Sequence, residues 1–407
     1  MRVLVVGGGL AGLTAAHLLG LEGHDATVLE AAPEAGGKLR RTEVGGVVVD
    51  VGAEAMLNRR PEGVALAREL GLDVVHPAVQ SSRIWTRGAL RPLPRSVMGV
   101  PVDLAELRKS GVLSEEGLAR VEAEQPGLPV DDDLSVGDLV ASRLGDEVVD
   151  RLVEPLLGGV YAGHARRLSA RATVPQLVFL ASNGPLLNAE LPPAGDAPVF
   201  AGLRGGMAGL TEALAARVPV RTDATVRELT RTGSGYAVVV GPTTRPERLE
   251  ADAVVVATPA APSARLLAEL APAAAAELAG IEYASMVVVT LAFPAAELAP
   301  GSIDDSSGFL VPPVDGRAIK ASTFSFAKWG WVREAGAEHG LVHLRTSLGR
   351  HGEEATLQRS DDELVAASLA DLAEAAGITA APVATHVQRW GGGLPQYTVG
   401  HLDRVAR

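Results

Sequence analysis

The amino-acid sequence predicts an α/β fold, α+β over the whole chain, in which a nucleotide-binding unit is interrupted by two insertions. Residues 1–30 have the pattern of strand, glycine-rich turn, helix and strand, and the same alternation returns near residue 200. Between them, residues 60–200 are mainly helical, with proline and glycine between the helices. A strand–turn–helix–strand beginning is typical of parallel sheets, so we expect the first unit to be Rossmann-like.

We predict three domains from these changes of pattern. The nucleotide-binding domain combines residues 1–58, 203–260 and 388–407. A helical insertion over residues 59–202 contributes part of the substrate site. Residues 261–387 form a strand-rich substrate-binding domain with a mixed sheet.

Local signals place the elements of the first unit. A helix is expected from about Gly9 to Leu21, and the strand Ala26–Leu29 follows a turn that contains Gly23. Residues 43–52 predict a hairpin that closes at Gly45-Gly46, because valines follow this pair on the return strand.

Later elements are predicted in the same way. Ser135 and Asp138 have the spacing of a capping box at the start of a helix, and a second helix is expected over Asp146–Leu157. The remaining expected elements are the helix Leu210–Arg217, the strands Val218–Arg221 and Thr225–Leu229, a strand within Ala251–Pro259, the strands Ser285–Phe293 and His343–Leu348, and the helix Asp361–Ala376.

Composition and charge exclude several classes of function. The net charge of the 407 residues is −12, and no basic stripe is present, so we expect no nucleic-acid partner. The sequence has no cysteine, which removes disulfides, iron–sulfur clusters, thiolate zinc sites and a cysteinyl flavin link. Its nine histidines show no metal-ligand spacing, so we expect no metal site.

The same inspection predicts a cytoplasmic protein. The strand Val3–Val6 follows Met1 and Arg2 directly, which leaves no room for a signal peptide in front of it. The longest apolar runs, such as Met286–Phe293, are far shorter than the roughly 20 residues of a membrane span, so no transmembrane segment is expected.

A glycine-rich loop carries the clearest functional signal. The expected loop is Gly7-Gly8-Gly9-Leu10-Ala11-Gly12, between an apolar strand and a helix. Glycines at its first, third and sixth positions permit a tight turn, close approach of a pyrophosphate and close packing of helix on strand. Glu30 ends the second strand, where a carboxylate binds ribose hydroxyls and disfavours a ribose phosphate. The loop therefore predicts a bound dinucleotide, against the alternative of an ordinary glycine-rich turn.

Two further segments favour FAD over NAD. Ala31 follows the acidic residue, and Gly37 and Lys38 then bring a second backbone segment and a cation toward the cofactor. The run Gly52-Ala53-Glu54-Ala55 ends the hairpin strand with another glycine. A domain that binds only NAD does not need these additions, although two surface turns would have the same composition.

These motifs resemble those of the flavin amine oxidase superfamily, and among its members the FAD-dependent porphyrinogen oxidases of haem biosynthesis, over essentially the whole chain. Glu34 stands where that superfamily has the arginine of its R-x-G-G motif. The matching segments are Val153-Glu154-Pro155, Gly158–Gly163, Leu168-Ser169, Leu203–Gly206, Tyr283-Ala284-Ser285, Gly308–Pro312, Lys328-Trp329, Arg389-Trp390, Leu394–Tyr397 and Gly400-His401.

The resemblance implies further site residues. It places Val226 at the adenine and Trp390 at the flavin ring, with FAD bound non-covalently. It also implies four substrate-binding candidates, which are Arg83, Tyr161, Gln396 and Tyr397. No catalytic side chain is identified, because the flavin does the chemistry. The last FAD motif of the superfamily has no counterpart before Arg407, so we expect the sequence to be truncated there.

The activity that the resemblance implies is oxidation of coproporphyrinogen III to coproporphyrin III by successive hydride transfers to FAD. O2 is the expected acceptor, H2O2 the by-product, and a ferrochelatase a candidate downstream partner. Protoporphyrinogen IX is the alternative substrate. An amine oxidase, a carotenoid desaturase and a non-catalytic flavoprotein remain open as alternative functions.

Overall fold

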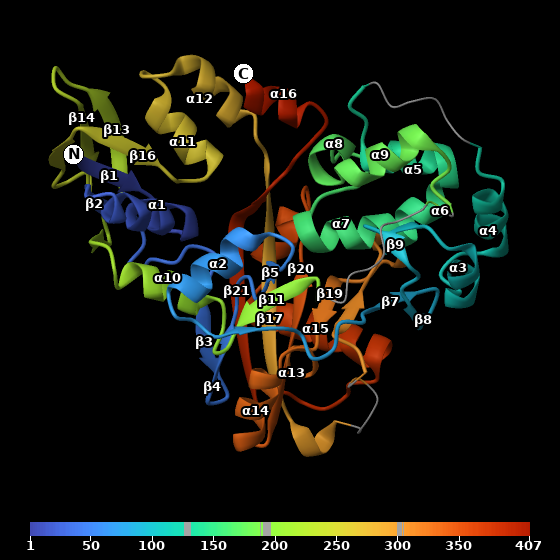
Figure 1. The fold of residues 1–407 in the computed structure, drawn as a ribbon. Coiled ribbons are helices and arrows are strands. Elements are labelled where there is room, and N and C mark those ends of the chain that lie inside the picture. Colours follow the sequence, from blue (N-terminus) through green and yellow to red (C-terminus); the bar gives the residue numbers. More distant parts are fainter. Residues whose placement is uncertain (126–131, 188, 190–196, 299–302, 304) are drawn as a thin grey trace.

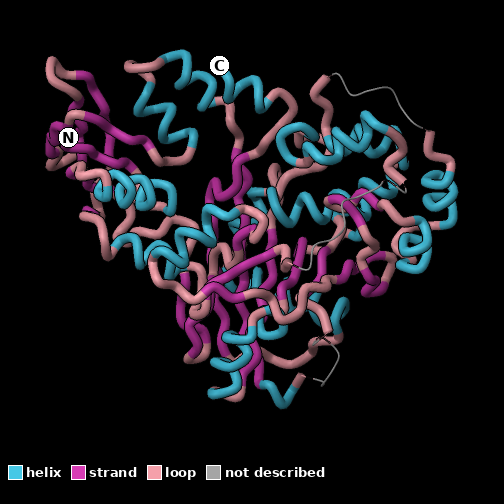
Figure 2. Tube along the Cα trace, in the orientation of Figure 1, coloured by secondary structure: helices cyan, strands magenta, loops and turns pink. Residues whose placement is uncertain are grey.

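The computed structural model describes residues 1–125, 132–187, 189, 197–298, 303 and 305–407. Figure 1 shows three lobes that meet at the centre, and both ends of the chain lie in its upper half. Figure 2 shows that the lower lobe is rich in strands, whereas the upper right lobe is made mainly of helices. The mixed α/β architecture agrees with the predicted fold class.

The N-terminal lobe is built on a four-stranded parallel sheet of order β12-β2-β1-β16. Its elements confirm the predicted strand–turn–helix–strand pattern, with the first helix and the second strand each within one residue of the expected start. They are β1 (Arg2–Val6), α1 (Leu10–Leu21), β2 (Asp25–Leu29), α10 (Ala208–Ala215), β12 (Val220–Arg221) and β16 (Ala253–Val256).

The apolar residues of β1 explain why this sheet is buried on both faces. Val3 and Val5 pack against Leu13 of α1 and against α10, whereas Leu4 and Val6 face the opposite cluster. Because successive side chains of a strand point to opposite faces, a continuous apolar run is typical of a doubly covered strand. The second cover is a three-stranded sheet of β13 (Val226–Arg231), β14 (Tyr236–Val240) and β15 (Glu247–Ala251), beside helices α11 (Ala260–Leu267) and α12 (Pro272–Ala279).

A mixed seven-stranded sheet forms the lower lobe, with the order β21-β17-β20-β19-β18-β7-β8. Among the strand pairs described for this sheet, only β18–β7 is parallel. The strands are β7 (Arg83–Thr86), β8 (Ala89–Pro92), β17 (Tyr283–Pro294), β18 (Gly308–Leu310), β19 (Ile319–Thr323), β20 (Leu341–Leu348) and β21 (Ala384–Pro395). Helix α15 (Asp361–Ala376) packs on it through Leu364 and Leu372 and has the predicted bounds.

Two features of this sheet lie outside the predicted pattern. Strand β21 crosses the predicted boundary between residues 387 and 388 and includes Gly391–Gly393, which gave no strand signal. Strands β7 and β8, from the predicted helical insertion, extend the other edge of the same sheet. The division into three domains stays a prediction.

The upper right lobe contains the helices of the insertion. Ser135 caps α5, since its Oγ accepts a hydrogen bond from the Asp138 backbone N at 3.0 Å. The helix expected at Asp146–Leu157 is longer and continues to Tyr161 through a π-helical turn. That turn ends two residues before Pro155, which has no N–H to donate to the preceding turn. The helices are α3 (Leu104–Ser110), α4 (Glu115–Glu122), α5 (Val136–Leu144), α6 (Asp146–Val148), the π-helix η1 (Val149–Val153), α7 (Glu154–Tyr161), α8 (Ala170–Thr173) and α9 (Pro175–Asn183).

The remaining elements of the structure are mostly short. The predicted hairpin is confirmed as β3 (Arg41–Val44) and β4 (Val47–Asp50). The others are β5 (Met56–Leu57), α2 (Pro61–Glu69), β6 (Val74–Val75), β9 (Ser96–Val97), β10 (Val100–Pro101), β11 (Phe200–Leu203), η2 (Ala295–Glu297), η3 (Pro313–Asp315), α13 (Ser325–Lys328), α14 (Gly330–Glu338), η4 (Glu354–Gln358) and α16 (His401–Ala406). None of the helices that the structure describes is long and apolar enough to span a bilayer.

A buried carboxyl joins the hairpin to helix α10. The Asp50 side chain is buried, and its Oδ2 accepts a hydrogen bond from the Met207 backbone N at 2.9 Å. Its Oδ1 has no hydrogen-bond partner among the described residues. Burial raises the pKa of Asp50 from its ordinary 3.8 to about 6, and the Met207 N–H opposes this shift.

We expect Asp50 to make the fold less stable as the pH rises from about 4 to about 6, because the unfolded carboxyl loses its proton first. The free energy of unfolding should fall by up to about 3 kcal/mol over this range from this residue. Asp50→Asn should remove that part of the pH dependence in denaturant titrations. Asp25→Asn, at an exposed position, is the control, and equal pH dependence in all three proteins would contradict the expectation.

Candidate active site

The predicted glycine-rich loop has the backbone geometry that its spacing requires. Gly7 has φ +108°, and a Cβ there would lie 2.8 Å from the Ala257 carbonyl oxygen. A Cβ at Gly12 would lie 1.9 Å from the Gly7 carbonyl oxygen, so only glycine lets α1 pack this closely on the loop. Helix α1 therefore begins directly at the loop, and the free N–H groups and positive dipole end of its first turn lie at the end of β1.

Glu30 is held at the end of β2 by backbone donors. Its Oε2 accepts a hydrogen bond from Gly8 N at 2.6 Å, and its Oε1 accepts one from Ala32 N at 2.8 Å. The carboxylate is thus fixed beside the glycine-rich loop.

A second pair of glycines packs on the loop. Gly36 N donates to the Gly8 carbonyl oxygen at 2.8 Å, and a Cβ at Gly37 would lie 3.1 Å from the Gly9 Cα. Two backbone segments therefore meet here without side chains between them. This contact leaves room for a ligand along the bare backbone.

A long cavity of about 900 Å³ runs over this contact. The predicted cofactor-binding residues that line it are Gly7, Gly9, Leu10, Ala11, Glu30, Ala31, Gly37, Lys38 and Val226. Gly8 and Gly12 lie in the same loop but are not among its lining residues. Tyr283, from one of the segments that resemble the family, also contributes to the wall, as do Arg227 and Arg265, for which the sequence gave no signal.

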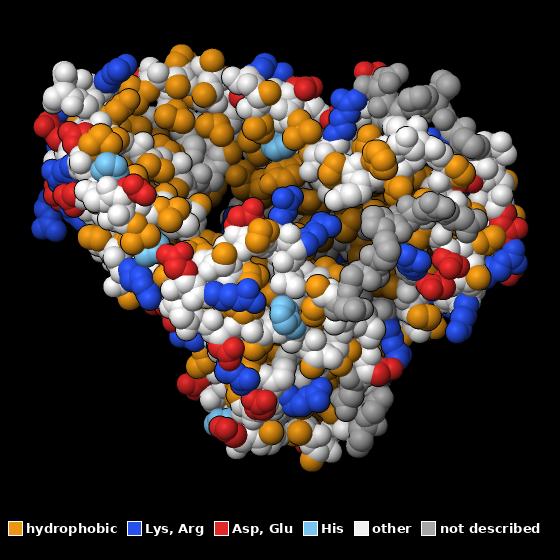
Figure 3. Space-filling view, viewed as in Figure 1, with side chains coloured by type: hydrophobic (Ala, Val, Ile, Leu, Met, Phe, Trp, Pro, Cys, Tyr) orange, Lys and Arg blue, Asp and Glu red, His pale blue; other side chains and the backbone are white. Residues whose placement is uncertain are grey.

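A second cavity, of about 430 Å³, adjoins the first at Lys38, which lines both. Three more predicted cofactor residues, Gly52, Ala53 and Trp390, line this second cavity. Trp390 Nε1 donates to the Val51 carbonyl oxygen at 3.2 Å, which fixes the indole beside Gly52. Figure 3 shows the molecular surface hollowed between the upper lobes, with hydrophobic side chains gathered around the hollow.

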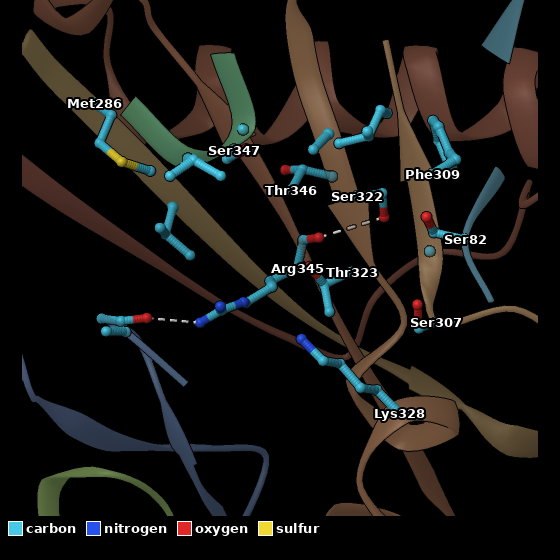
Figure 4. Close-up of a pocket in the computed structure, with 18 of the residues that line it drawn as sticks. Ser82, Met286, Ser307, Phe309, Ser322, Thr323, Lys328, Arg345, Thr346 and Ser347 are labelled. Carbon is cyan, nitrogen blue, oxygen red and sulfur yellow. Dashed lines mark hydrogen bonds between the residues drawn. The ribbon is translucent and has the colours of Figure 1, made fainter. Parts of the chain in front are cut away.

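The wall of the second cavity combines apolar and cationic groups. Its apolar side chains include Leu156, Val160, Phe200, Met286, Val288, Phe309, Leu310 and Leu394. The described residues that line it include three cations, Lys38, Lys328 and Arg345, and no aspartate or glutamate. In Figure 4, Lys328 and Arg345 extend side by side into this space. The cavity is therefore suited to an anionic ligand with a large apolar surface.

Glu54 lies behind these cations. Its Oε1 is 2.6 Å from Lys328 Nζ, and its Oε2 is 3.2 Å from Arg345 Nη2. Burial opposes the ionisation of Glu54, but Arg345 and Lys328 together hold its pKa below the ordinary value. Ala55, the next residue, packs against the apolar cluster around Val47 and Trp329.

The four predicted substrate-binding residues are not among those that line either cavity. Arg83 forms an ion pair with Asp305 at the surface, although its neighbour Ser82 lines the second cavity. The other three lie together near α7: Gln396 Nε2 donates to the Tyr161 carbonyl oxygen at 2.8 Å, and the Tyr161 and Tyr397 ring centroids are 5.7 Å apart. Their substrate-binding role stays a prediction.

The sequence analysis did not identify Arg345 in the cavity wall or Lys320 close to it. Arg345 lies on β20, and its side chain is largely buried. A charged residue within a mainly apolar strand was the sequence signal that could have identified it. Lys320 on β19 is 2% exposed, with its Nζ 3.9 Å from Met286 Sδ at the cavity wall. Burial, with a smaller contribution from Arg350, lowers the pKa of Lys320 to about 7, whereas Glu353 opposes this shift. The ion pairs of the described residues do not include this lysine.

Known proteins resemble this chain along nearly its whole length. The coproporphyrinogen III oxidase of Mycobacterium tuberculosis is 39% identical over 420 residues, which cover 99% of this chain and 88% of that protein. The coproporphyrinogen III oxidase of Bacillus subtilis is 30% identical, with 99% and 89% covered. A crystal structure of a putative protoporphyrinogen oxidase from Exiguobacterium superposes with a TM-score of 0.85, at 30% identity, over 100% of this chain and 90% of that one.

A family model defines the wider group. The model described as flavin containing amine oxidoreductase matches residues 10–406, which include helix α1, all the lining residues of the second cavity and strand β21. The same fold occurs in putrescine oxidase bound to putrescine, with a TM-score of 0.67 at 19% identity over 99% of this chain and 90% of that one. This chain belongs to the family of flavin-containing amine oxidoreductases.

Proposed function

We propose that this chain is an FAD-dependent oxidase that converts coproporphyrinogen III into coproporphyrin III in haem b biosynthesis. The observation that carries the proposal is the second cavity, which has apolar walls, three cations and no carboxylate among its described lining residues. A porphyrinogen with four propionates has this combination of a broad apolar ring and negative charge. Relatives named coproporphyrinogen III oxidase, at 30–39% identity over 99% of the chain, support the same substrate.

The residues of the long cavity fit FAD. Its floor is bare backbone, because a Cβ at Gly37 would lie 3.1 Å from the Gly9 Cα. The pyrophosphate would be held at the start of α1 by Gly9, Leu10 and Ala11, and a ribose by Glu30. The adenine would lie against Val226. With FAD held in this way, its flavin ring would lie toward the second cavity, which shares Lys38 with the first.

The flavin ring would be held by Gly52, Ala53 and Trp390, with Lys38 between the two cavities. When bound, FAD supplies an acceptor for the hydride that leaves the substrate. The protein itself binds the macrocycle, orients it and keeps water away from its apolar face. No strong general base is required, because the pyrrole rings activate the hydrogen that is removed.

The proposed function also includes an electron acceptor, a mode of FAD attachment, a cellular location and a partner protein. We infer that O2 is the electron acceptor and that H2O2 is released. We also infer non-covalent binding of FAD from the resemblance, and the sequence contains no cysteine for a thioether link. A cytoplasmic location and transfer of the product to a ferrochelatase also belong to this proposal.

We predict that the FAD-loaded protein oxidises coproporphyrinogen III well above the rate of autoxidation. Porphyrin fluorescence and H2O2 should increase together, and coproporphyrinogen III should react faster than protoporphyrinogen IX. A flavin-containing protein that gives no excess rate would contradict the oxidase function. A faster reaction with protoporphyrinogen IX would overturn the choice of substrate.

Gly9→Ala should weaken FAD binding without disturbing the fold. The added Cβ has no neighbour closer than the Gly37 Cα at 4.0 Å, so it enters the space proposed for the pyrophosphate. We expect the FAD dissociation constant to rise about tenfold or more, which corresponds to about 1.4 kcal/mol. Titration of the apoprotein with FAD, followed by flavin fluorescence, measures it.

Gly20→Ala is the matched control, because Gly20 lies on the helix that begins directly after Gly9 and its Cβ would meet no atom within 4 Å. Equal FAD dissociation constants for the Gly9→Ala, Gly20→Ala and unmodified proteins would show that the loop is not part of the cofactor site.

A further inference from the structure

Glu54 joins two cations that come from distant parts of the chain. Lys328 is the last residue of α13, and Arg345 lies in the middle of β20. Each ion pair involves a different oxygen of the same carboxylate, at 2.6 Å and 3.2 Å. The Glu54 side chain is 8% exposed, and each of the two cations is 15% exposed. The three groups therefore form a nearly buried cluster at the cavity wall.

Other contacts restrict the two cations further. Arg345 Nη1 donates to the Gly52 carbonyl oxygen at 2.8 Å, which ties the guanidinium to the segment that ends the hairpin. Lys328 Nζ lies 5.4 Å from the Phe200 ring centroid and 5.3 Å from that of Trp329. Both side chains are thus positioned before any ligand arrives, and Figure 4 shows them directed into the cavity.

The ion pairs of the cluster contain more cations than carboxylates. Within ion-pair distance, one carboxylate faces two cations next to an apolar cavity. Asp50, whose pKa burial raises to about 6, is a further carboxyl that interacts with Arg345 and Glu54, but it forms no ion pair with either cation among the described residues. Among the described residues, Lys328 Nζ makes one hydrogen bond, whereas an ammonium group has three donors. A buried charge without a partner is unfavourable, and a second carboxylate would complete the balance.

We propose that Lys328 and Arg345 form a carboxylate-binding pair that receives one propionate of the porphyrinogen, and that Glu54 is the positioning residue that holds the pair in place. This inference rests on the proposed function, since it assigns a part of the substrate to a part of the same cavity. The propionate would form charge-assisted hydrogen bonds with both cations, and the cluster would then contain two positive and two negative groups. The pair thereby sets the orientation of the macrocycle.

The pair also discriminates between substrates by their charge. A ring substituent without a carboxylate would leave the excess cation unpaired in an apolar environment. A porphyrin whose propionates are esterified should therefore lose the contribution of the pair, although its ring is unchanged.

Binding of coproporphyrin III, the stable product, to the FAD-loaded protein tests this directly. Arg345→Gln and Lys328→Met should each weaken binding of the free acid about tenfold or more. Binding of coproporphyrin III tetramethyl ester should change less than about twofold in the same variants. Porphyrin fluorescence anisotropy measures both ligands. Arg204→Gln, which removes an arginine from an exposed ion-pair site, is the matched control and should leave both affinities unchanged.

Conservative variants keep the test valid if a charge deletion prevents folding. Arg345→Lys and Lys328→Arg retain the positive charge and should bind the free acid more tightly than the neutral variants do. Glu54→Gln removes the positioning charge, so it should lower kcat more than it changes KM for coproporphyrinogen III. Equal losses for acid and ester, or unchanged affinity for the acid, would overturn the assignment of the pair.

These outcomes are separable from the proposed function. If the unmodified protein oxidises coproporphyrinogen III but Arg345→Gln and Lys328→Met bind coproporphyrin III normally, the function stands and the pair is refuted. If the unmodified protein has no oxidase activity but its affinity for the acid depends on the pair, the carboxylate site stands and the function is refuted.

Discussion

The structure depends on one close contact between two backbone segments that have no side chains at the point where they meet. The glycine-rich loop after β1 and the Gly36-Gly37 pair approach so closely that Gly36 N donates to the Gly8 carbonyl oxygen at 2.8 Å. On the other side, Gly12 lets helix α1 pack against the loop. Packing thus creates both the compact βαβ core and the bare groove that a dinucleotide requires.

The residues that follow Gly37 in the chain connect this backbone contact to the second cavity. Lys38 comes directly after Gly37, and a Cβ at Gly52 would lie 2.1 Å from the Lys38 carbonyl oxygen, so the hairpin strand packs against the groove. Trp390 of β21 then binds the Val51 carbonyl oxygen. The seven-stranded sheet is joined to the nucleotide-binding lobe at this point, and its cations Lys328 and Arg345 are brought to the end of the groove.

Local signals explain which parts of the structure could be predicted from the sequence. The segment from β1 to β2 was predicted almost residue by residue, because its apolar runs and glycines act over short distances. Strand β21 was missed because Gly391–Gly393 favour a loop, and in the structure they form an unpaired irregularity between Trp390 and Leu394, which both pair with β17. The Glu54 cluster could not be inferred, since its carboxylate and Lys328 are 274 residues apart and meet only in the folded chain.

In the proposed reaction, a flavin in the long cavity would accept electrons from a porphyrinogen in the adjoining one. Anaerobic mixing of the FAD-loaded protein with coproporphyrinogen III tests it most directly, with the absorbance of the bound flavin followed in time. We expect the flavin to be reduced in a single phase on substrate binding and to be reoxidised when O2 is admitted. Flavin that stays oxidised in the presence of excess coproporphyrinogen III would contradict it.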